Sequence, residues 1–289
     1  GKSNFNRNNT FTNEVITFLL KKKVELIIYK PFFEEYTKII NSIECKTFSK
    51  KEDLITDQSI DYLLSLGGDG TFLDAANFIG NANIPILGIN TGRIGFLTGI
   101  NKNNFEECWE LLENKEYEIE ERTLLHLSTN RSDLRHPTNY ALNDITIHST
   151  VESAIIAIHV WVNNVKINTY WADGLIIATP TGSTAYSLSC GGPIIVPNAN
   201  VLILTPIASH SLSVRPIIIS DDSVLKIKVD SRNEKFSLSC DSHQITLENP
   251  IEMTIKKGTF AIKTVRFKSA DFFSVIREKL LWGIDIRNI

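Results

Sequence analysis

The sequence predicts an α/β domain built on a parallel sheet, then a β-rich domain, with a last helix that returns to the first domain. Strand-like and helix-like segments alternate up to about residue 100, which predicts helices on both faces of a parallel sheet. Beyond one further helix, later segments show the period-two pattern of half-buried strands, which is typical of a β-sandwich or barrel. Helical spacing returns at Phe272–Trp282. We expect an α/β domain at residues 1–99 and 270–289, and a β-sandwich domain at residues 100–269.

Apolar spacing places the elements of the first half. Phe11, Val15 and Leu19 recur at helical intervals, whereas short apolar runs that end at glycine or proline predict buried strands. The asparagine-rich start resembles a loop, so we expect a first strand to precede residue 1. The predicted helices are Thr10–Lys23, Phe32–Ile43, Thr71–Ile79 and Asn104–Leu112, and the predicted strands are Val24–Tyr29, Tyr62–Leu66 and Pro85–Ile89.

The second half contains many short alternating segments. Asn163-Asn164 separates two of them, and two asparagines between strands are a signal for a tight hairpin. The predicted strands are Tyr117–Glu120, Leu124–Ser128, Leu142–His148, Ala154–Val162, Val165–Tyr170, Leu175–Ala178, Val201–Thr205, Pro216–Ser220, Val224–Val229, Phe236–Cys240, Ile251–Lys256 and Thr264–Phe267.

Composition excludes several classes of protein. The net charge of −3 provides no basic face for nucleic acid, and no apolar run or signal-peptide pattern predicts a membrane segment. The four cysteines are scattered without a C-x-x-C pair, which argues against a zinc site or a disulfide framework and suits a reducing cytosol. We therefore expect a cytoplasmic protein without nucleic-acid or membrane partners.

The most informative segment is the turn Gly67-Gly68-Asp69-Gly70-Thr71, which follows an apolar strand. Its glycines remove side chains, so backbone amides can approach an anion closely. The remaining side chain in the loop is a carboxylate, which repels phosphate unless a metal intervenes or the carboxylate accepts a proton. The combination indicates phosphoryl chemistry. The alternative is a simple tight turn, because Asp-Gly is a common turn dipeptide.

Two other segments carry polar groups at strand ends. The run Asp173–Tyr186 passes from an apolar strand into a cluster of hydroxyls, with a helix start expected at Thr184. Such a start binds phosphate or a base edge, unless the hydroxyls only cap the helix. The pair Asn143-Asp144 offers an amide for an adenine edge and a carboxylate for ribose hydroxyls. As a dipeptide, it also fits a β-bulge or turn.

In combination these three segments resemble the motifs of NAD kinases. Gly88–Leu97 and Gly191-Gly192-Pro193 also match, and the resemblance spans about residues 60–220 in order. The glycine turn is less specific, because diacylglycerol, sphingosine and other lipid kinases share it. The segment Thr179–Tyr186 discriminates. One departure is Asp241-Ser242-His243-Gln244, where many family members have aspartate-glycine-glutamine, so no ligand contact is assigned there.

The resemblance implies a Rossmann-like first domain, a β-sandwich second domain, a cleft between them and a homotetramer. It implies an ATP-dependent kinase that phosphorylates the 2′-hydroxyl of the adenosine ribose of NAD. By position, the resemblance implies that Asp69 is the catalytic carboxylate. The implied NAD contacts are Asn143 and Asp144 for the adenosine part and ribose, Thr181, Thr184, Ala185 and Tyr186 for the adenine and nicotinamide pockets, Asp173 and Ser189 near the nicotinamide, and Phe96 beside the adenine.

The residues fit this chemistry. A ribose hydroxyl is a weak nucleophile, and Asp69 is placed to accept its proton or to orient it. The amides around Gly68 and Gly70 are expected to hold the ATP phosphates, with Mg²⁺ bridging the phosphate oxygens. Arg93 is a candidate for charge neutralisation, and we expect no protein metal site. The chain has no Walker A, H-E-x-x-H or G-x-S-x-G pattern.

Two alternatives stay open on sequence alone. A lipid kinase would share the glycine turn but would phosphorylate diacylglycerol or a sphingoid base. A catalytically silent dinucleotide sensor would bind NAD or NADP without turnover, although the intact Asp69 makes it less attractive.

Overall fold

A computed structural model describes residues 10–36, 45–55, 60–92, 95–131, 138–150, 155–232, 234–268 and 271–282. The contacts between residues divide the chain into two compact units. The first unit comprises Gly1–Glu120 and Lys263–Ile289, and the second comprises Glu121–Ile262.

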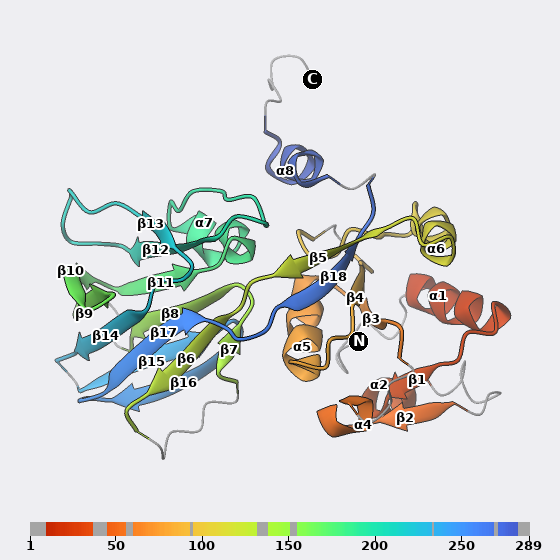
Figure 1. Ribbon diagram of the computed structural model, residues 1–289, viewed down its shortest axis with the longest axis horizontal. Helices are drawn as coiled ribbons and strands as arrows, with labels where there is room; N and C mark the ends of the chain where they lie inside the picture. Colours follow the sequence, from red (N-terminus) through yellow and green to blue (C-terminus); the bar gives the residue numbers. More distant parts are fainter. Residues whose placement is uncertain are drawn as a thin grey trace. The chain divides into compact units, whose positions relative to one another are not determined.

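A four-stranded sheet forms the centre of the first unit, in the order β3-β4-β18-β5 (Figure 1). β3 (Leu63–Leu66) pairs in parallel with β4 (Ile86–Ile89). β18 (Ile262–Arg266) pairs in parallel with the other side of β4, and β5 (Glu118–Arg122) forms the edge. Every residue of β4 is buried, which explains why its sequence is apolar throughout instead of alternating. The predicted parallel sheet is confirmed.

Helices cover both faces of this sheet. α5 (Asp69–Ile79) lies along one face, while α1 (Thr10–Lys21) and α6 (Phe105–Glu113) lie along the other (Figure 1). Leu87 of β4 joins the core that α1 and α6 form, whereas the neighbouring Gly88 lies against α5. Successive residues of a strand point to opposite faces, so one strand serves both layers.

A smaller parallel pair, β1 (Ile27–Tyr29) and β2 (Lys46–Phe48), completes the described strands of this unit. It lies beside α2 (Lys30–Glu35) and is followed by α4 (Lys51–Ile55). The helix predicted at Phe32–Ile43 therefore starts earlier, because Pro31 occupies the first turn of α2, where proline is favoured. Residues 37–43 of that prediction lie outside the described ranges.

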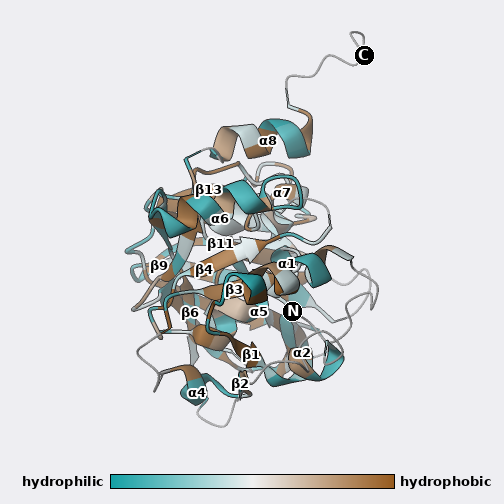
Figure 2. Ribbon diagram, turned by 90° about the vertical axis from the view of Figure 1, so that its right-hand side faces the viewer, coloured by the Kyte–Doolittle hydropathy of each residue, from teal (hydrophilic) through white to brown (hydrophobic). Residues whose placement is uncertain are grey.

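The tail forms α8 (Phe272–Leu280), which belongs to the first unit as the return of helical spacing predicts. The Asp271 carboxylate caps it by accepting hydrogen bonds from the amides of Phe273 and Ser274. Figure 2 shows hydrophobic and hydrophilic residues along α8. Phe273 on the helix and Leu281 after it are exposed.

The limits of the two units differ from the positions where the sequence pattern changes. Contacts assign residues 100–120 and 263–269 to the first unit, whereas the pattern predicts limits at residues 99 and 270. The difference arises because α6 packs on α1, and because β5 and β18 complete the first sheet. The Thr264 hydroxyl of β18 donates to the Glu120 carbonyl of β5 (3.2 Å).

The second unit consists of two six-stranded sheets, in the orders β10-β9-β14-β17-β6-β7 and β13-β12-β11-β8-β15-β16. The described pairings within both sheets are antiparallel. Two short helical turns follow β11. The elements are β6 (Leu125–Thr129), β7 (Tyr140–Ala141), β8 (Asp144–Ser149), β9 (Ile156–Val162), β10 (Val165–Ala172), β11 (Gly174–Ala178), the 3₁₀ turn η1 (Thr181–Thr184), α7 (Tyr186–Ser189), β12 (Val201–Ile207), β13 (Ile217–Ser220), β14 (Leu225–Asp230), β15 (Lys235–Cys240), β16 (His243–Glu248) and β17 (Glu252–Lys257).

Side chains from both sheets form one core, so the predicted β-sandwich is confirmed. Ile147 and Ile177 come from one sheet, and Ile158 and Ile227 from the other, and all four are fully buried. The Asn163-Asn164 hairpin has φ values of 49° and 68°, the left-handed conformation that such turns require. No helix in the described ranges is long and apolar enough to cross a membrane.

Candidate active site

The glycine-rich turn joins β3 to α5 and places Asp69 at the first position of the helix. Gly67 has a φ of 154°, and a Cβ there would overlap the Thr71 side chain, so the position requires glycine. The Gly67 amide donates to the Ile89 carbonyl at the end of β4 (2.9 Å). The turn is therefore fixed to the carboxyl ends of two neighbouring parallel strands, where ligands bind in open α/β sheets.

The Asp69 carboxylate accepts three hydrogen bonds from the segment that follows β4. Oδ2 accepts from the Phe96 amide (2.7 Å), while Oδ1 accepts from the Leu97 amide (3.1 Å) and the Thr98 hydroxyl (3.1 Å). A Cβ at Gly95 would overlap this carboxylate. Asp69 thus holds the segment against the glycine turn, a contact that sequence reasoning did not predict.

Gly68 and Gly70 leave open space over the first turn of α5. A Cβ at either position would meet no described atom within 4 Å. Amides in the first turn of a helix precede the intrahelical hydrogen bonds and carry the positive end of the helix dipole. α5 has 11 residues, so its N-terminus suits a phosphate group.

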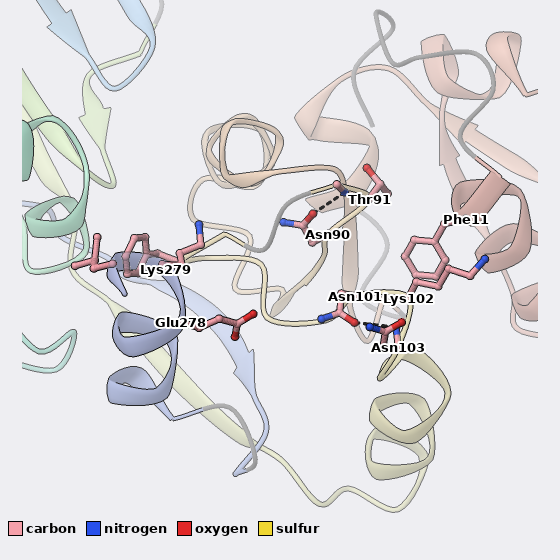
Figure 3. A pocket seen from close by; sticks show the side chains of 11 residues that line it. Phe11, Asn90, Thr91, Asn101, Lys102, Asn103, Glu278 and Lys279 are labelled. Atoms are coloured by element: carbon pink, nitrogen blue, oxygen red, sulfur yellow. Dashed lines mark hydrogen bonds between the residues drawn. The ribbon is translucent and has the colours of Figure 1, made fainter. Parts of the chain in front are cut away.

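A pocket of about 720 Å³ lies beside Phe96 in the first unit (Figure 3). The Lys279 ammonium is 4.8 Å from the centre of the Phe96 ring, a cation–π contact, and Lys102 forms an ion pair with Glu14 (2.7 Å). This volume is typical of small-molecule sites. The other lining residues are Phe11, Asn90, Thr91, Gly92, Asn101, Asn103, Glu278 and Leu280.

In the second unit, Asp241 holds the backbone of the Asn143-Asp144 pair. Its Oδ2 accepts from the Leu142 amide (2.8 Å), and its Oδ1 accepts from the amides of Asn143 (2.8 Å) and Asp144 (3.1 Å). Three amides on one carboxylate fix the loop tightly, because charge-assisted hydrogen bonds are strong. Sequence reasoning assigned no contact to Asp241.

A signal for Asp241 does exist in the sequence. Only two residues separate the alternating strands β15 and β16, which predicts a tight turn. Asp241 is the first of the two and has a φ of 50°. Aspartate tolerates this conformation better than most residues, so its side chain is available to a neighbouring loop.

The hydroxyl-rich segment lies against the same loop. The Thr179 amide donates to the Asn143 carbonyl (2.9 Å), and the Thr179 hydroxyl donates to the Leu142 carbonyl (2.6 Å) and accepts from the Gly182 amide (3.1 Å). A Cβ at Gly182 would overlap the Asn143 carbonyl. Two of the predicted site segments are therefore joined directly, and Asp241 binds one of them, the Asn143-Asp144 loop.

The remaining predicted residues of this segment differ in exposure. Thr181 is buried, Thr184 and Ala185 are half-buried, and Tyr186 and Ser189 are exposed. The Thr184 hydroxyl donates to the Thr181 carbonyl (3.2 Å), which closes the short 3₁₀ turn. The side chains that a ligand can reach therefore lie in the C-terminal part of this segment, from Thr184 onward.

Asp173 precedes β11, and Thr179 follows it. Gly174 pairs with His148 and Ala178 pairs with Asp144, so the length of the strand separates the Asp173 backbone from the Asn143-Asp144 loop. The structure does not bring these backbones together. The Tyr186 side chain interacts electrostatically with carboxylates at both ends, Asp144 and Asp173.

Burial dominates the electrostatics of this loop cluster. It raises the pKa of Asp144 to about 7, with a smaller contribution from the Asp241 charge, while the hydrogen bond from Thr146 (2.8 Å) opposes the shift. Burial also raises the pKa of Asp241, although the three amides act in the opposite direction. The pKa of Tyr186 is raised by burial and then by nearby Cys190 and the two carboxylates.

Within the described ranges, no group of three or more His, Cys, Asp or Glu residues is arranged to hold a metal ion. Arg93, the candidate for charge neutralisation, lies outside the described residues.

The α/β unit carries an aspartate at the start of a helix, and the β-sandwich unit carries a rigid cluster of polar loops. Each feature suits a phosphotransferase of the kinase class, and the family models show that class directly. The family model for the ATP-NAD kinase N-terminal domain matches residues 2–117, and that for the C-terminal domain matches residues 142–267. The chain belongs to the ATP-NAD kinase family.

Curated relatives agree over nearly the whole length. The chain is 42% identical over 278 residues to the NAD kinase of Flavobacterium psychrophilum, covering 95% of this chain and 93% of the relative. It is 44% identical over 255 residues to the NAD kinase of Bacteroides fragilis, covering 88% and 87%. Because both units are matched, the lipid-kinase alternative, which depends on the glycine turn alone, is set aside.

Solved structures show the same architecture. The yeast NADH kinase complexed with NADH matches with a TM-score of 0.83 and 26% identity, covering 98% of this chain and 86% of that one. The Archaeoglobus fulgidus NAD kinase in complex with ATP matches with a TM-score of 0.65 and 30% identity, covering 87% and 94%.

Proposed function

We propose that this protein transfers the terminal phosphoryl group of ATP to the 2′-hydroxyl of the adenosine ribose of NAD, giving NADP. The observation that carries the proposal is the placement of Asp69, a carboxylate fixed by three hydrogen bonds at the N-terminus of α5. Membership of the ATP-NAD kinase family supports this choice of substrates.

Asp69 is the proposed general base. An ionised carboxylate has about four acceptor positions. Among the described residues two donors occupy Oδ1 and one occupies Oδ2, so Oδ2 keeps a position for the proton of the ribose hydroxyl. General-base help is typically worth about 10²–10⁴-fold. The rest of the rate enhancement comes from positioning and from charge neutralisation of the phosphates.

The second unit supplies most of the proposed NAD contacts. Its loop cluster presents an amide and a carboxylate on a rigid backbone, which suits an adenine edge and ribose hydroxyls. The relative solved with NADH supports a dinucleotide ligand. We assign Asn143 and Asp144 to the adenosine part and ribose, Thr181, Thr184, Ala185 and Tyr186 to the adenine and nicotinamide pockets, Asp173 and Ser189 to the nicotinamide end, and Phe96 to the adenine.

The start of α5 is the proposed site of the ATP phosphates. Gly68 and Gly70 leave room for them over the first-turn amides. Mg²⁺ enters as part of the MgATP substrate and neutralises charge on the triphosphate. The Archaeoglobus fulgidus relative in complex with ATP supports this donor.

We also propose a homotetramer in the cytoplasm. Val165, Ile167 and Trp171 on the edge strand β10 are exposed, and exposed apolar side chains on an edge suit contact with a second copy. The four cysteines carry no disulfide, which suits a reducing compartment.

The test is the incubation of purified protein with ATP, Mg²⁺ and NAD, with NADP measured by an enzyme-coupled assay. Asp69→Asn keeps the shape of the side chain but removes the proton acceptor, so we expect kcat to fall by about 10²-fold or more. The matched control is Asp61→Asn, at an exposed position just before β3.

Each outcome has a clear meaning. NADP formation by wild type that is lost in Asp69→Asn and kept in Asp61→Asn supports the proposal. Wild-type rates in Asp69→Asn would remove Asp69 from the mechanism. Calorimetric binding of NAD without NADP formation by wild type would favour the silent dinucleotide sensor.

A further inference from the structure

A buried asparagine is linked to the Asp69 carboxylate by hydrogen bonds through a buried threonine. Asn90 follows β4 and is 2% exposed, and Thr98 is fully buried. The Asn90 Nδ2 donates to Thr98 Oγ1 (2.9 Å), and the Thr98 hydroxyl donates to Asp69 Oδ1 (3.1 Å). The three side chains therefore form a continuous hydrogen-bonded chain that ends on the proposed base.

The direction of this chain is set by the Asn90 amide group. The Gly92 amide donates to Asn90 Oδ1 (2.7 Å), so the amide oxygen faces Gly92 and the NH₂ group faces Thr98. A hydroxyl has one hydrogen to donate. Because Asn90 provides the donor to Thr98 Oγ1, the Thr98 hydrogen is left for Asp69 Oδ1.

We propose that Asn90 and Thr98 are positioning residues that determine which oxygen of Asp69 takes the proton of the ribose hydroxyl. They fill the second acceptor position of Oδ1, so that, with the donors of the described segments in place, the open position is on Oδ2. This inference rests on the proposed function of Asp69.

In the proposed reaction two bonds break and two form. The 2′ O–H bond breaks and its proton moves to Asp69 Oδ2. The ribose oxygen forms a bond to the γ-phosphorus of ATP. The bond from that phosphorus to the β,γ-bridging oxygen breaks, and its electron pair leaves with ADP.

The backbone of the Thr98 segment has other supports besides the Thr98 hydroxyl, including the Phe96 and Leu97 amides on Asp69. The Asn90 amide donates to the Ile100 carbonyl (2.6 Å), and the Ile100 amide donates to the Gly88 carbonyl (3.4 Å). A Cβ at Gly88 would lie 2.9 Å from the Leu97 carbonyl oxygen, so the segment also packs closely on β4. Removal of the hydroxyl should therefore leave the backbone in place and act on Asp69.

The test compares Thr98→Val with Thr98→Ser. Valine keeps the volume but donates no hydrogen bond, so we expect kcat to fall about 10- to 100-fold, the typical effect of one hydrogen bond to a charged group. We expect KM for NAD and for ATP to stay within about twofold, because this contact is not a substrate contact. Serine keeps the hydroxyl and should restore most of kcat.

Thr264→Val is the matched control. Thr264 is also buried in the first unit, and its hydroxyl donates to a backbone carbonyl of β5. The control should keep wild-type kcat, and melting temperatures show whether each variant is folded. If Thr98→Val does not accumulate as folded protein, Thr98→Ala replaces it.

Asn90→Asp tests the direction of the chain. Its carboxylate still accepts from the Gly92 amide but cannot donate to Thr98, so it takes the Thr98 hydrogen away from Asp69. We expect a loss of kcat at least as large as that of Thr98→Val.

Three results would overturn the inference: unchanged kcat in Thr98→Val, a serine variant as impaired as the valine variant, or a loss confined to KM. Asp69→Asn, measured in parallel, separates this failure from that of the proposed function. If Asp69→Asn is inactive while Thr98→Val is normal, Asp69 is retained as the base and only the positioning chain is removed.

Discussion

Asp241 and Asp144 hold each other through reciprocal hydrogen bonds. The Asp241 amide donates to the Asp144 carbonyl (2.9 Å), and the Asp144 amide donates back to the Asp241 carboxylate (3.1 Å). The same carboxylate accepts from the two preceding amides. The turn between β15 and β16 therefore acts as a clamp on the loop proposed to bind the adenosine part of NAD.

The first prediction concerns Asp241→Asn. Asparagine tolerates the φ of 50° at this position, so the turn itself survives. Its NH₂ group must face at least one of the three amides, because Asp241 presents both oxygens to amide donors. We expect a loss of about 1–3 kcal/mol in the free energy of unfolding and a higher KM for NAD. Denaturant unfolding and steady-state kinetics measure the two effects.

The control for that variant is Asp222→Asn, at an exposed turn position of the same unit. It should change neither the stability nor KM. If Asp241→Asn behaves like this control, Asp241 does not clamp the loop.

The second prediction concerns the pH dependence of stability. Burial raises the pKa of Asp144 from 3.8 to about 7, so between these values the folded protein holds a proton that the unfolded chain releases. The stabilisation that comes from this bound proton is fully present below pH 3.8 and is lost as the pH rises to about 7. Each unit by which the pKa is raised corresponds to about 1.4 kcal/mol of that stabilisation. Asp144→Asn cannot titrate, so its unfolding free energy should fall less between pH 4 and pH 7. Parallel curves for the two proteins would contradict the raised pKa.

The third prediction concerns NAD binding through the same group. In its proposed role Asp144 accepts a hydrogen bond from a ribose hydroxyl of NAD, and the ionised form is the better acceptor because the protonated form has less acceptor capacity. KM for NAD should therefore decrease as the pH rises through about 7. The groups that act on Asp144 and its neighbours electrostatically include Asp241, Tyr186 and Cys190. If KM for NAD still decreases through about pH 7 in Asp144→Asn, one of these three groups is responsible for the pH dependence instead.

The sheet and the sandwich could be predicted from local patterns. The apolar run of β4 is typical of a buried parallel strand, and the Asn163-Asn164 pair adopts the left-handed turn that it predicts. The sheet to which β18 belongs could not be predicted in this way. Its alternating pattern is that of a sandwich strand, and only its pairing with β4, far away in the sequence, places it in the first sheet.

The candidate site also has a part that local sequence predicts and a part that it does not. Asp69 could be singled out because the composition of its turn is local information. The partners of its carboxylate, Phe96, Leu97 and Thr98, come from a segment that reaches the turn only through the packing of β3 beside β4. Asp241 was missed for the same reason, because its partners lie in another loop of the folded sandwich.

The fourth prediction concerns Gly95→Ala. A Cβ at this position would overlap the Asp69 carboxylate and also approach the Thr98 hydroxyl, so alanine must displace Asp69 from its three donors. A small displacement of a catalytic group costs about 10²-fold in rate. We expect kcat to fall by about that factor while the protein keeps its fold, as judged by its circular dichroism spectrum. Normal kcat in this variant would mean that catalysis does not require the Asp69 carboxylate at its observed position.

The fifth prediction concerns Gly70→Ala, a variant that distinguishes an effect on ATP binding from an effect on stability. An added Cβ at Gly70 would meet no described atom within 4 Å, and alanine is a better helix former than glycine by about 1 kcal/mol. The variant should therefore melt at the same temperature as wild type or higher. If the ATP phosphates lie over this turn, the new methyl group enters the space that they need, and KM for ATP should rise about tenfold or more. KM for NAD should change less, because its proposed contacts lie mainly in the second unit. A more stable protein with an unchanged KM for ATP would place the phosphates elsewhere, since the open space over Gly70 would then hold no part of the donor.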